Sequence, residues 1–172
     1  FDNTIKSIEQ IERRGYSLLA VIPSIGSKTT KRKTKKIISQ NKNLEKIERR
    51  LITHEDPKSP ISEAYRGLRT SLMYTKSNEN CRIILVSSAG PGEGKTTTIA
   101  NLAITYANLG KKTILIDSDL RKPVVHNIFN VDKSPGLTSY LSENEKDEKK
   151  LINKTNIKNL DVITSGVIPP NP

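Results

Sequence analysis

One short glycine-rich stretch limits what this chain can fold into more than any other feature. It reads Ser-Ser-Ala-Gly-Pro-Gly-Glu-Gly-Lys-Thr-Thr over residues 87–97, after an apolar run at 82–86 and before a helical pattern over 95–109. Glycines let successive backbone N–H groups turn toward one side, and the amino end of a helix adds partial positive charge. A strand, a loop of this kind and a helix form an arrangement that cradles phosphate groups. The stretch therefore predicts a phosphate-binding loop.

The residue types in this loop indicate a nucleoside triphosphate as the ligand. Lys95 is expected to reach the β and γ phosphates, and the Thr96 hydroxyl is expected to hold Mg²⁺. Ala89 stands where the strict motif has glycine. A glycine-rich turn without a ligand is the alternative. The expected nucleotide-binding residues are Gly90, Pro91, Gly92, Glu93, Gly94, Lys95, Thr96 and Thr97.

Apolar runs and helical periodicity alternate along the chain. Strands are expected at 17–23, 82–86, 113–116 and 160–163, and helical stretches at 2–15, 44–51, 60–72, 95–109, 136–142 and 146–154. Strands that alternate with helices indicate parallel βαβ units. The predicted fold class is α/β, a P-loop NTPase-like parallel sheet with flanking helices.

Composition excludes several classes of protein. No apolar run approaches the roughly 18 residues that a membrane span needs, and the single cysteine, Cys81, excludes a disulfide framework and a cysteine zinc site. Hydrophobic residues make up only 34% of the chain, so part of it is expected to lie outside the core. The chain begins at Phe1 without a signal-peptide pattern, and we expect it to be a piece of a longer sequence.

Positive charge is concentrated in the first third of the chain. Residues 28–36 hold six cations and no acidic or aromatic residue. Three interpretations stay open for this run: a solvated linker, a polybasic segment against anionic lipid, or a nucleic-acid site, although the last lacks stacking groups. The expected domains are a segment over 1–23, a basic linker over 24–58 and a P-loop domain over 59–172.

A second acidic motif ends the strand expected at 113–116. Asp117 and Asp119 follow that strand, and carboxylates at the carboxyl end of a parallel strand lie beside the ligand crevice of an open α/β sheet. In an extended geometry residues two apart face the same way. One carboxylate is then suited to take a proton from an attacking hydroxyl and the other to hold Mg²⁺. A solvated turn that caps the next helix is the alternative.

Three charged residues recur on the helix that begins at Pro60. Glu63, Arg66 and Arg69 are spaced by three and form a slanting ridge. The apolar stripe of the same helix comprises Ile61, Tyr65, Leu68 and Leu72. From spacing alone, the ridge is an ordinary solvated face with a weak pair between Glu63 and Arg66.

Taken together, these motifs resemble the bacterial tyrosine kinases of the polysaccharide co-polymerase system, which control capsule and exopolysaccharide chain length. The similarity covers most of the chain: residues 2–6, 19–23, 63–69, 87–97, 117–123 and 166–172. Its most specific parts are the E-x-x-R-x-x-R helix and the D-x-D-x-R-K-P strand end.

The resemblance implies roles that the spacing did not reveal. It implies that Lys95, Asp117 and Asp119 are catalytic, with Asp117 activating the hydroxyl and Asp119 joining Thr96 at Mg²⁺. It also implies that the helix with Glu63, Arg66 and Arg69 packs against a neighbouring subunit in a ring. ATP is the implied phosphoryl donor, and tyrosines of an adjacent subunit are the implied acceptors.

The family likeness further implies partners and a location. The partners are a transmembrane co-polymerase region, fused or separate, and a cognate tyrosine phosphatase, with no nucleic acid. The implied location is the cytoplasmic face of a bacterial plasma membrane. Two family features are missing, a later D-x-x-P motif and a C-terminal tyrosine cluster; Asp161 has no proline at the required position and the last tyrosine is Tyr140. A truncated sequence with an incomplete sheet is therefore expected, and such a chain alone is expected to bind nucleotide poorly.

Two other functions remain as alternatives to the kinase. One is a non-catalytic, nucleotide-gated assembly module of the polysaccharide export machinery. The other is a partition-type P-loop ATPase, although such ATPases typically carry an additional lysine where this chain has Gly90 and Pro91.

Overall fold

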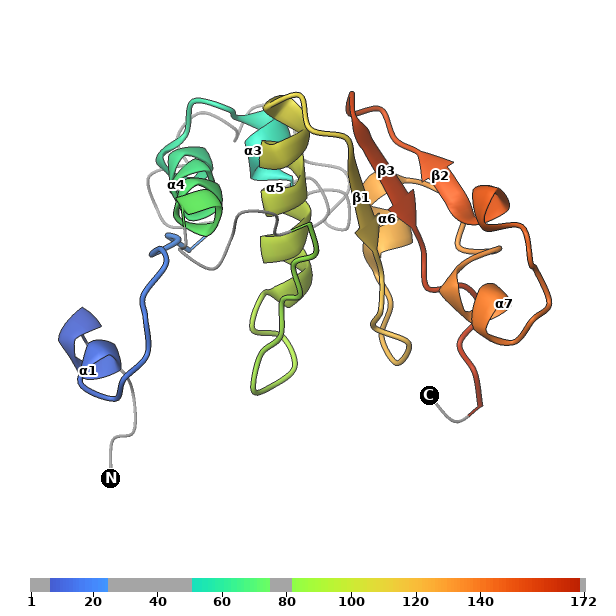
Figure 1. Ribbon diagram of the computed structural model, residues 1–172, viewed down its shortest axis with the longest axis horizontal. Coiled ribbons are helices and arrows are strands. Elements are labelled where there is room, and N and C mark those ends of the chain that lie inside the picture. The colour runs from blue at the N-terminus through green and yellow to red at the C-terminus, as the bar shows by residue number, and fades with distance from the viewer. Residues whose placement is uncertain (1–6, 25–50, 75–81, 171–172) are drawn as a thin grey trace, which may run out of the picture.

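The computed structural model describes residues 7–24, 51–74 and 82–170, and it places a small sheet beside a layer of helices (Figure 1). The α/β class predicted from the sequence is confirmed. None of the helices in the described part of the chain has the length and apolar character that a bilayer crossing requires. In chain order the elements are α1 (Ile8–Glu12), α3 (Ile52–Glu55), α4 (Pro60–Tyr74), α5 (Lys95–Asn108), β1 (Thr113–Ile116), α6 (Val125–Phe129), α7 (Leu137–Leu141), the 3₁₀ turn η2 (Glu148–Leu151), β2 (Ile152–Lys154) and β3 (Leu160–Ile163).

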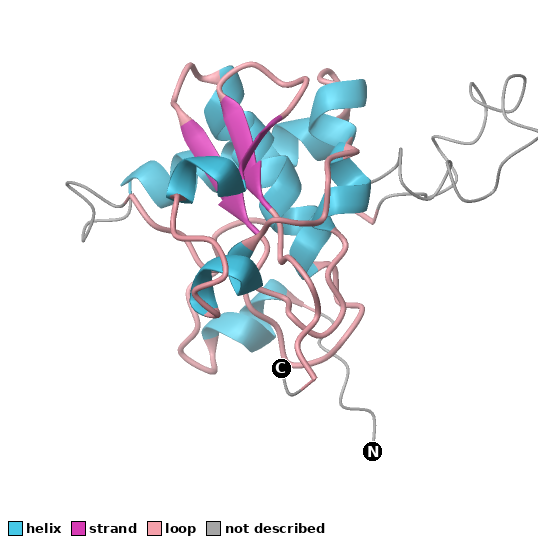
Figure 2. Ribbon diagram, turned by 90° about the vertical axis from the view of Figure 1, so that its right-hand side faces the viewer, coloured by secondary structure: helices cyan, strands magenta, loops and turns pink. Residues whose placement is uncertain are grey.

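The sheet has the strand order β1-β3-β2 and is mixed (Figure 2). β1 runs parallel to β3 with Thr113 opposite Leu160, as the alternation of strands and helices predicted. β2 runs antiparallel to β3 with Ile152 opposite Ile163. A helix was predicted over 146–154, but only η2 is helical there. The second half of that segment forms β2 because it pairs with β3. This pairing overrides the helical preference that the Glu and Lys residues give to the segment as a whole.

Helix α5 is the centre of the described fold. It lies between α3 and α4 on one side and β1 on the other (Figure 1). Its small and branched residues Ala100, Ile104 and Ala107 are almost fully buried, and they join the core cluster of the sheet and α6. A helix that is apolar on most of its circumference is expected in such a central position. The segment after the phosphate loop is therefore held from two sides.

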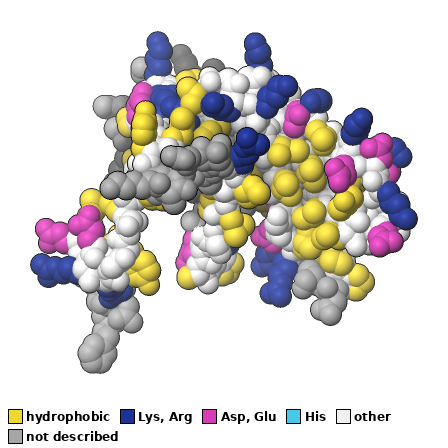
Figure 3. All heavy atoms as spheres, in the orientation of Figure 1, with side chains coloured by type: hydrophobic (Ala, Val, Ile, Leu, Met, Phe, Trp, Pro, Cys, Tyr) yellow, Lys and Arg dark blue, Asp and Glu magenta, His cyan; other side chains and the backbone are white. Residues whose placement is uncertain are grey.

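One face of the sheet is packed and the other is open. Leu115 and Val162 are buried against the helices, whereas Ile114 and Ile116 alternate with Leu115 and are exposed. Figure 3 shows hydrophobic side chains gathered over this open face. The alternation follows from the two-residue period of a strand, which sends neighbouring side chains to opposite faces.

The expected basic linker ends earlier than the sequence indicated. Residues 51–58 were assigned to it, but Ile52 and Thr53 are buried in α3. Ile52 packs with Ile61 and Tyr65 of α4 in a second small core cluster, and Leu68 packs against it, which confirms three of the four residues of the apolar stripe predicted for α4. The cation-rich run at 28–36 and the helical stretch expected at 44–51, apart from its last residue, lie outside the described residues.

The segment expected to form a strand at 17–23 is extended but joins no sheet in the described chain. It lies along α4 instead, where the Ser71 hydroxyl donates to the Leu19 carbonyl at 3.0 Å and Ile22 packs on the second cluster. The segment therefore contacts side chains of α4 and not the backbone of a neighbouring strand. The prediction of a strand here was wrong.

The strand predicted at 82–86 is also absent. These residues form no ladder with β1 or β3 in the described chain, and Ile83 and Leu85 are 88% and 85% exposed. Their β-branched pattern indicates a buried strand, but a strand exists only when a neighbour accepts and donates its backbone hydrogen bonds. β1 remains an edge strand of the described sheet.

Candidate phosphate-binding site

The glycine-rich loop turns into α5 through two residues with left-handed backbone. Gly92 has φ +78° and Gly94, the residue before α5, has φ +90°. Such φ values strain any residue with a Cβ atom, which explains why the sequence places glycines at these positions. The Gly94 carbonyl accepts the Thr98 amide at 2.8 Å, so the helix begins directly after the turn. The predicted loop therefore leads directly into the amino end of α5.

Lys95 folds back over the loop. Its Nζ donates to the Ser88 hydroxyl oxygen at 3.1 Å and to the Gly90 carbonyl at 3.2 Å. The Ser88 hydroxyl in turn donates to the same carbonyl at 2.8 Å. Ser88 was not among the predicted binding residues. The signal that could have found it is its place just before the glycines, where a hydroxyl reaches the lysine that the motif supplies.

Glu93 bridges the loop from the other side. Its carboxylate accepts the Gly90 amide at 3.0 Å. The Gly90 amide, the Ser88 hydroxyl and the Lys95 ammonium together hold the pKa of the Glu93 carboxyl below its usual range. The carboxylate is therefore ionised at neutral pH and ties the two ends of the turn together.

The two carboxylates after β1 lie in different environments. Asp117 is 5% exposed, and its oxygens accept the Asp119 amide at 3.2 Å and the Val125 amide of α6 at 3.1 Å. Asp119 is exposed and accepts the amides of Arg121 and Lys122. One carboxylate is therefore buried beside α6 and the other lies at the surface.

Burial makes the Asp117 carboxyl a weaker acid than an exposed carboxyl. Removal from water raises the pKa of its carboxyl above the ordinary value, although the hydrogen bonds from Val125 and Asp119 oppose that rise. Asp117 is also fixed in position by the sheet, since its amide continues the β1–β3 ladder to the Ile163 carbonyl at 2.9 Å. A buried, rigidly held carboxylate with a raised pKa is suited to accept a proton.

The fold brings the loop and the acidic motif to the same end of the molecule. β1 runs back along α5, so its carboxyl end lies toward the helix start (Figure 1). In the described residues no ion pair joins Lys95 to either carboxylate, and no group of three or more possible metal ligands is present. Mg²⁺ is commonly held by one or two protein oxygens together with phosphates and waters. The Thr96 hydroxyl and the Asp119 carboxylate fit that donor set.

The charged ridge of α4 is engaged within this chain. Arg66 forms a two-pronged pair with Glu63, which lowers the pKa of that carboxyl, and also donates to the Pro57 carbonyl at 2.6 Å. Arg69 points the other way: its Nη1 donates to the Thr105 carbonyl in the last turn of α5 at 2.9 Å. The same carbonyl also accepts the Leu109 amide at 3.3 Å, so Arg69 adds a second, charged donor to the last turn of α5 and caps it from α4.

The cap on α5 can be tested by removing the guanidinium while keeping the stem. Arg69→Met is expected to lower the free energy of unfolding by about 1 kcal/mol or more, because a charge-assisted hydrogen bond to a half-buried carbonyl is lost. Urea unfolding measures the change, with Glu63→Gln as the control that removes an exposed partner. An unchanged unfolding midpoint for Arg69→Met would contradict the capping role.

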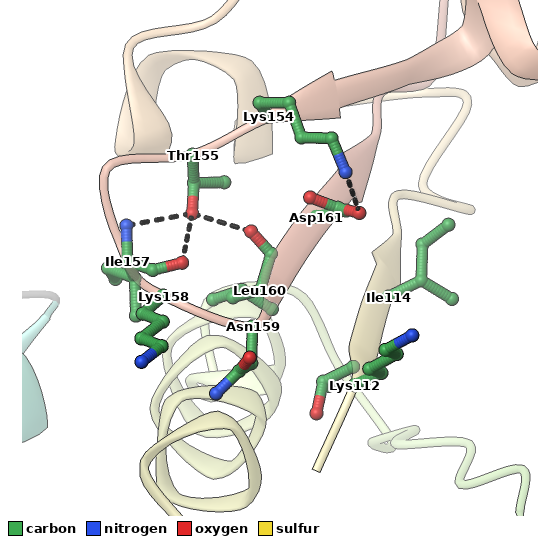
Figure 4. Close-up of a pocket in the computed structure, with 10 residues that line it drawn as sticks. Lys112, Ile114, Lys154, Thr155, Ile157, Lys158, Asn159, Leu160 and Asp161 are labelled. Atoms are coloured by element: carbon green, nitrogen blue, oxygen red, sulfur yellow. Dashed lines mark hydrogen bonds and ion pairs between the residues drawn. The ribbon is translucent and has the colours of Figure 1, made fainter. Parts of the chain in front are cut away.

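A shallow hollow lies at the opposite end of the sheet and is a separate feature (Figure 4). It is formed around the starts of β1 and β3, where Lys154 donates to the Asp161 carboxylate at 2.7 Å and the Thr155 hydroxyl donates to the Leu160 carbonyl. Asp117 follows the other end of β1. The hollow is therefore not part of the phosphate-binding site.

Comparison with known proteins shows which proteins this chain is similar to. A family described as AAA domain matches residues 81–168, about half of the chain. Tyrosine-protein kinase YwqD of Bacillus subtilis is 46% identical over 127 residues, which cover 74% of this chain and 53% of that protein. Tyrosine-protein kinase Etk of Escherichia coli K12 is 34% identical over 171 residues, 98% of this chain and 23% of that protein. The chain thus spans about half or less of these relatives.

Solved structures agree with the sequence comparison. The kinase domain of Escherichia coli tyrosine kinase ETK superposes with a TM-score of 0.80 at 30% identity, covering 98% of this chain and 63% of that one. The chimerical protein CapA2B2 superposes with a TM-score of 0.76 at 37% identity, covering 96% of this chain and 62% of that one. Both likenesses extend over almost the whole chain.

Proposed function

This chain belongs to the AAA-domain family, and from that premise and its similarity to bacterial tyrosine kinases we propose that it transfers the γ-phosphoryl group of ATP to tyrosine. The single observation that carries the proposal is the loop before α5, where Lys95 binds back to Ser88 and Gly90 and the left-handed Gly92 and Gly94 lead into the helix start. The buried carboxylate of Asp117 at the same end of the fold supplies a base. Phosphate cradle and base are the two parts that this reaction needs.

Each residue of the site has a place in the proposed reaction. The backbone N–H groups of residues 92–97 hold the phosphates, and Lys95 balances the charge that develops as the bond to the β–γ bridging oxygen breaks. Asp117 takes the proton of the tyrosine hydroxyl while the phenolic oxygen bonds to the γ phosphorus and ADP leaves. When bound, Mg²⁺ neutralises phosphate charge, and Thr96 and Asp119 are the residues that would hold it.

The wider role is proposed from the family resemblance. We propose autophosphorylation between neighbouring subunits of a ring, with Glu63, Arg66 and Arg69 on the helix at the subunit contact. Glu63 is exposed and Arg66 half-buried, whereas the guanidinium of Arg69 already has a partner in α5. The proposed setting is the cytoplasmic face of a bacterial plasma membrane, beside a transmembrane co-polymerase region and a cognate tyrosine phosphatase. There the kinase regulates capsule or exopolysaccharide polymerisation and export.

Phosphorylation in solution tests the proposed reaction directly. Incubation of the full-length protein with labelled ATP and Mg²⁺ is expected to give phosphotyrosine that survives alkali, and omission of Mg²⁺ is expected to suppress it. A tagged protein lacking the Asp117 carboxylate, Asp117→Asn, should become labelled only when the untagged parent is added, which separates transfer between subunits from transfer within one. ATP hydrolysis without any phosphotyrosine would reject the kinase and favour the ATPase.

A further inference from the structure

A buried polar contact ties α3 to the helix that carries the phosphate loop. Thr53 of α3 is 1% exposed and Asn101 of α5 is 0% exposed. The Thr53 hydroxyl and the Thr53 amide both donate to the Asn101 side-chain oxygen, at 2.8 and 3.0 Å. Buried polar side chains are retained in a core only with good partners. These two residues are 48 positions apart, so the contact joins two separate parts of the described chain.

The same asparagine continues the contact toward the phosphate loop. Its side-chain nitrogen donates to the Thr97 carbonyl at 2.8 Å. Thr97 lies in the first turn of α5, beside Lys95 and Thr96. A second link reaches this turn from α4, where the buried hydroxyl of Tyr65 is hydrogen-bonded to Thr98. The turn that presents the binding residues is therefore braced from behind by both helices.

We propose that Thr53 is a positioning residue for nucleotide binding, acting through Asn101 on the first turn of α5. The inference rests on the proposed function, since it assumes that Lys95 and Thr96 meet the phosphates. Small displacements of groups that bind a ligand weaken binding strongly, and a first turn of a helix held only by its own backbone is free to fray. Thr53 fixes the asparagine side chain, and the asparagine fixes the Thr97 carbonyl. The strength of phosphate binding thereby depends on how α3 is seated.

Nucleotide affinity in three variants tests this positioning. Thr53→Val keeps the shape of the side chain and removes its hydroxyl, and it is expected to weaken Mg·ATP binding by about tenfold. Thr53→Ser restores the hydroxyl and should return the affinity to within about twofold of the parent. Titration with a fluorescent ATP analogue, at a temperature well below each unfolding midpoint, measures the dissociation constants.

The matched control is the same threonine-to-valine substitution at a different buried threonine, Thr105 of α5. The Thr105 hydroxyl donates to the Leu102 carbonyl within the helix, at 2.7 Å, and lies far from the loop. Thr105→Val should lower the thermal midpoint but leave ATP affinity unchanged. If Thr53→Val behaved like Thr105→Val, with lower stability and parental affinity, the role of Thr53 would be structural and the inference would be overturned. If the parent protein failed to bind Mg·ATP, the proposed function itself would fall.

Hydrogen exchange provides a test that needs no variant. Coupling between two sites is reciprocal, so a nucleotide that orders the first turn of α5 should also order α3. Addition of Mg·ADP to the parent protein is expected to slow amide exchange in residues 52–55 as well as in residues 90–98. Slower exchange in the loop alone, with no change in α3, would contradict the proposal even if Thr53→Val did not fold.

Discussion

Replacing Lys95 by methionine is expected to reduce ATP-dependent tyrosine phosphorylation to background, about a thousandfold below the parent protein. Methionine has a similar reach but no charge, so the phosphates lose the cation that the loop holds over them. The two fold contacts of Lys95 are hydrogen bonds to Ser88 and Gly90 in a partly exposed loop. The fold is therefore expected to stay intact while phosphoryl transfer stops, as measured by labelled ATP.

The control for Lys95 is a lysine in the hollow at the other end of the sheet. Lys112 precedes β1, is exposed, and lies away from the phosphate loop. Lys112→Met removes the same charge and should leave phosphotyrosine formation unchanged. If Lys95→Met retained parental activity, the loop would not be the phosphoryl-transfer site. Normal polymer length in a bacterial strain carrying Lys95→Met would instead favour the non-catalytic assembly module.

The elements that sequence reasoning predicted correctly are those whose pattern is local. Glycine permits left-handed backbone, and Gly92 and Gly94 of the loop adopt it. The stripe that starts at Ile61 places one face of α4 inward, as a helix of that period must. In these two cases the deciding pattern lies within a few turns of the chain. The parallel pairing of β1 with β3 joins distant residues, but the helical segments between the two strands indicate it.

The predictions that failed depend on partners distant in the chain. A β-branched run such as 82–86 has strand propensity, but its ladder needs a neighbour that the described sheet does not provide. Asp117 and Asp119 differ in burial, and the Asp117 carboxylate accepts amides from a turn and from the distant α6. The contact of Thr53 with Asn101 left only a weak local signal, a polar side chain on the otherwise mostly apolar buried part of α5. A hydrogen bond between side chains that are distant in the chain cannot be predicted from either sequence segment alone.

Replacing Gly136 by alanine is expected to lower the free energy of unfolding by about 3 kcal/mol or more. Its backbone is extended, a conformation that any residue adopts, so the obstacle is space. An added Cβ would lie against the Gly166 amide nitrogen, 2.5 Å from the Thr164 carbonyl oxygen and 2.7 Å from the Gly166 Cα. These are backbone atoms, which cannot rotate away as the end of a side chain can.

The position of Gly136 links this clash to the site. The next two amides, of Leu137 and Thr138, donate to the carbonyls of Thr164 and Ser165, both at 2.8 Å. That segment directly follows β3, whose last carbonyl holds the Asp117 amide. Gly136→Ala is therefore expected to separate α7 from the end of β3 and to make the position of Asp117 less fixed. The rate of phosphoryl transfer should then fall together with the free energy of unfolding.

Gly67→Ala is the matched control, because the same atom is added where nothing lies within 4 Å. Gly67 is exposed in the middle of α4, where alanine is preferred over glycine by about 0.5–1 kcal/mol. The two substitutions should thus shift the urea midpoint in opposite directions. Equal, small shifts for both would show that residues 164–166 move aside at little expense, and the close approach of α7 to β3 would then not constrain the fold. Opposite shifts, with activity lost only at position 136, would place that approach among the interactions that hold Asp117 in position.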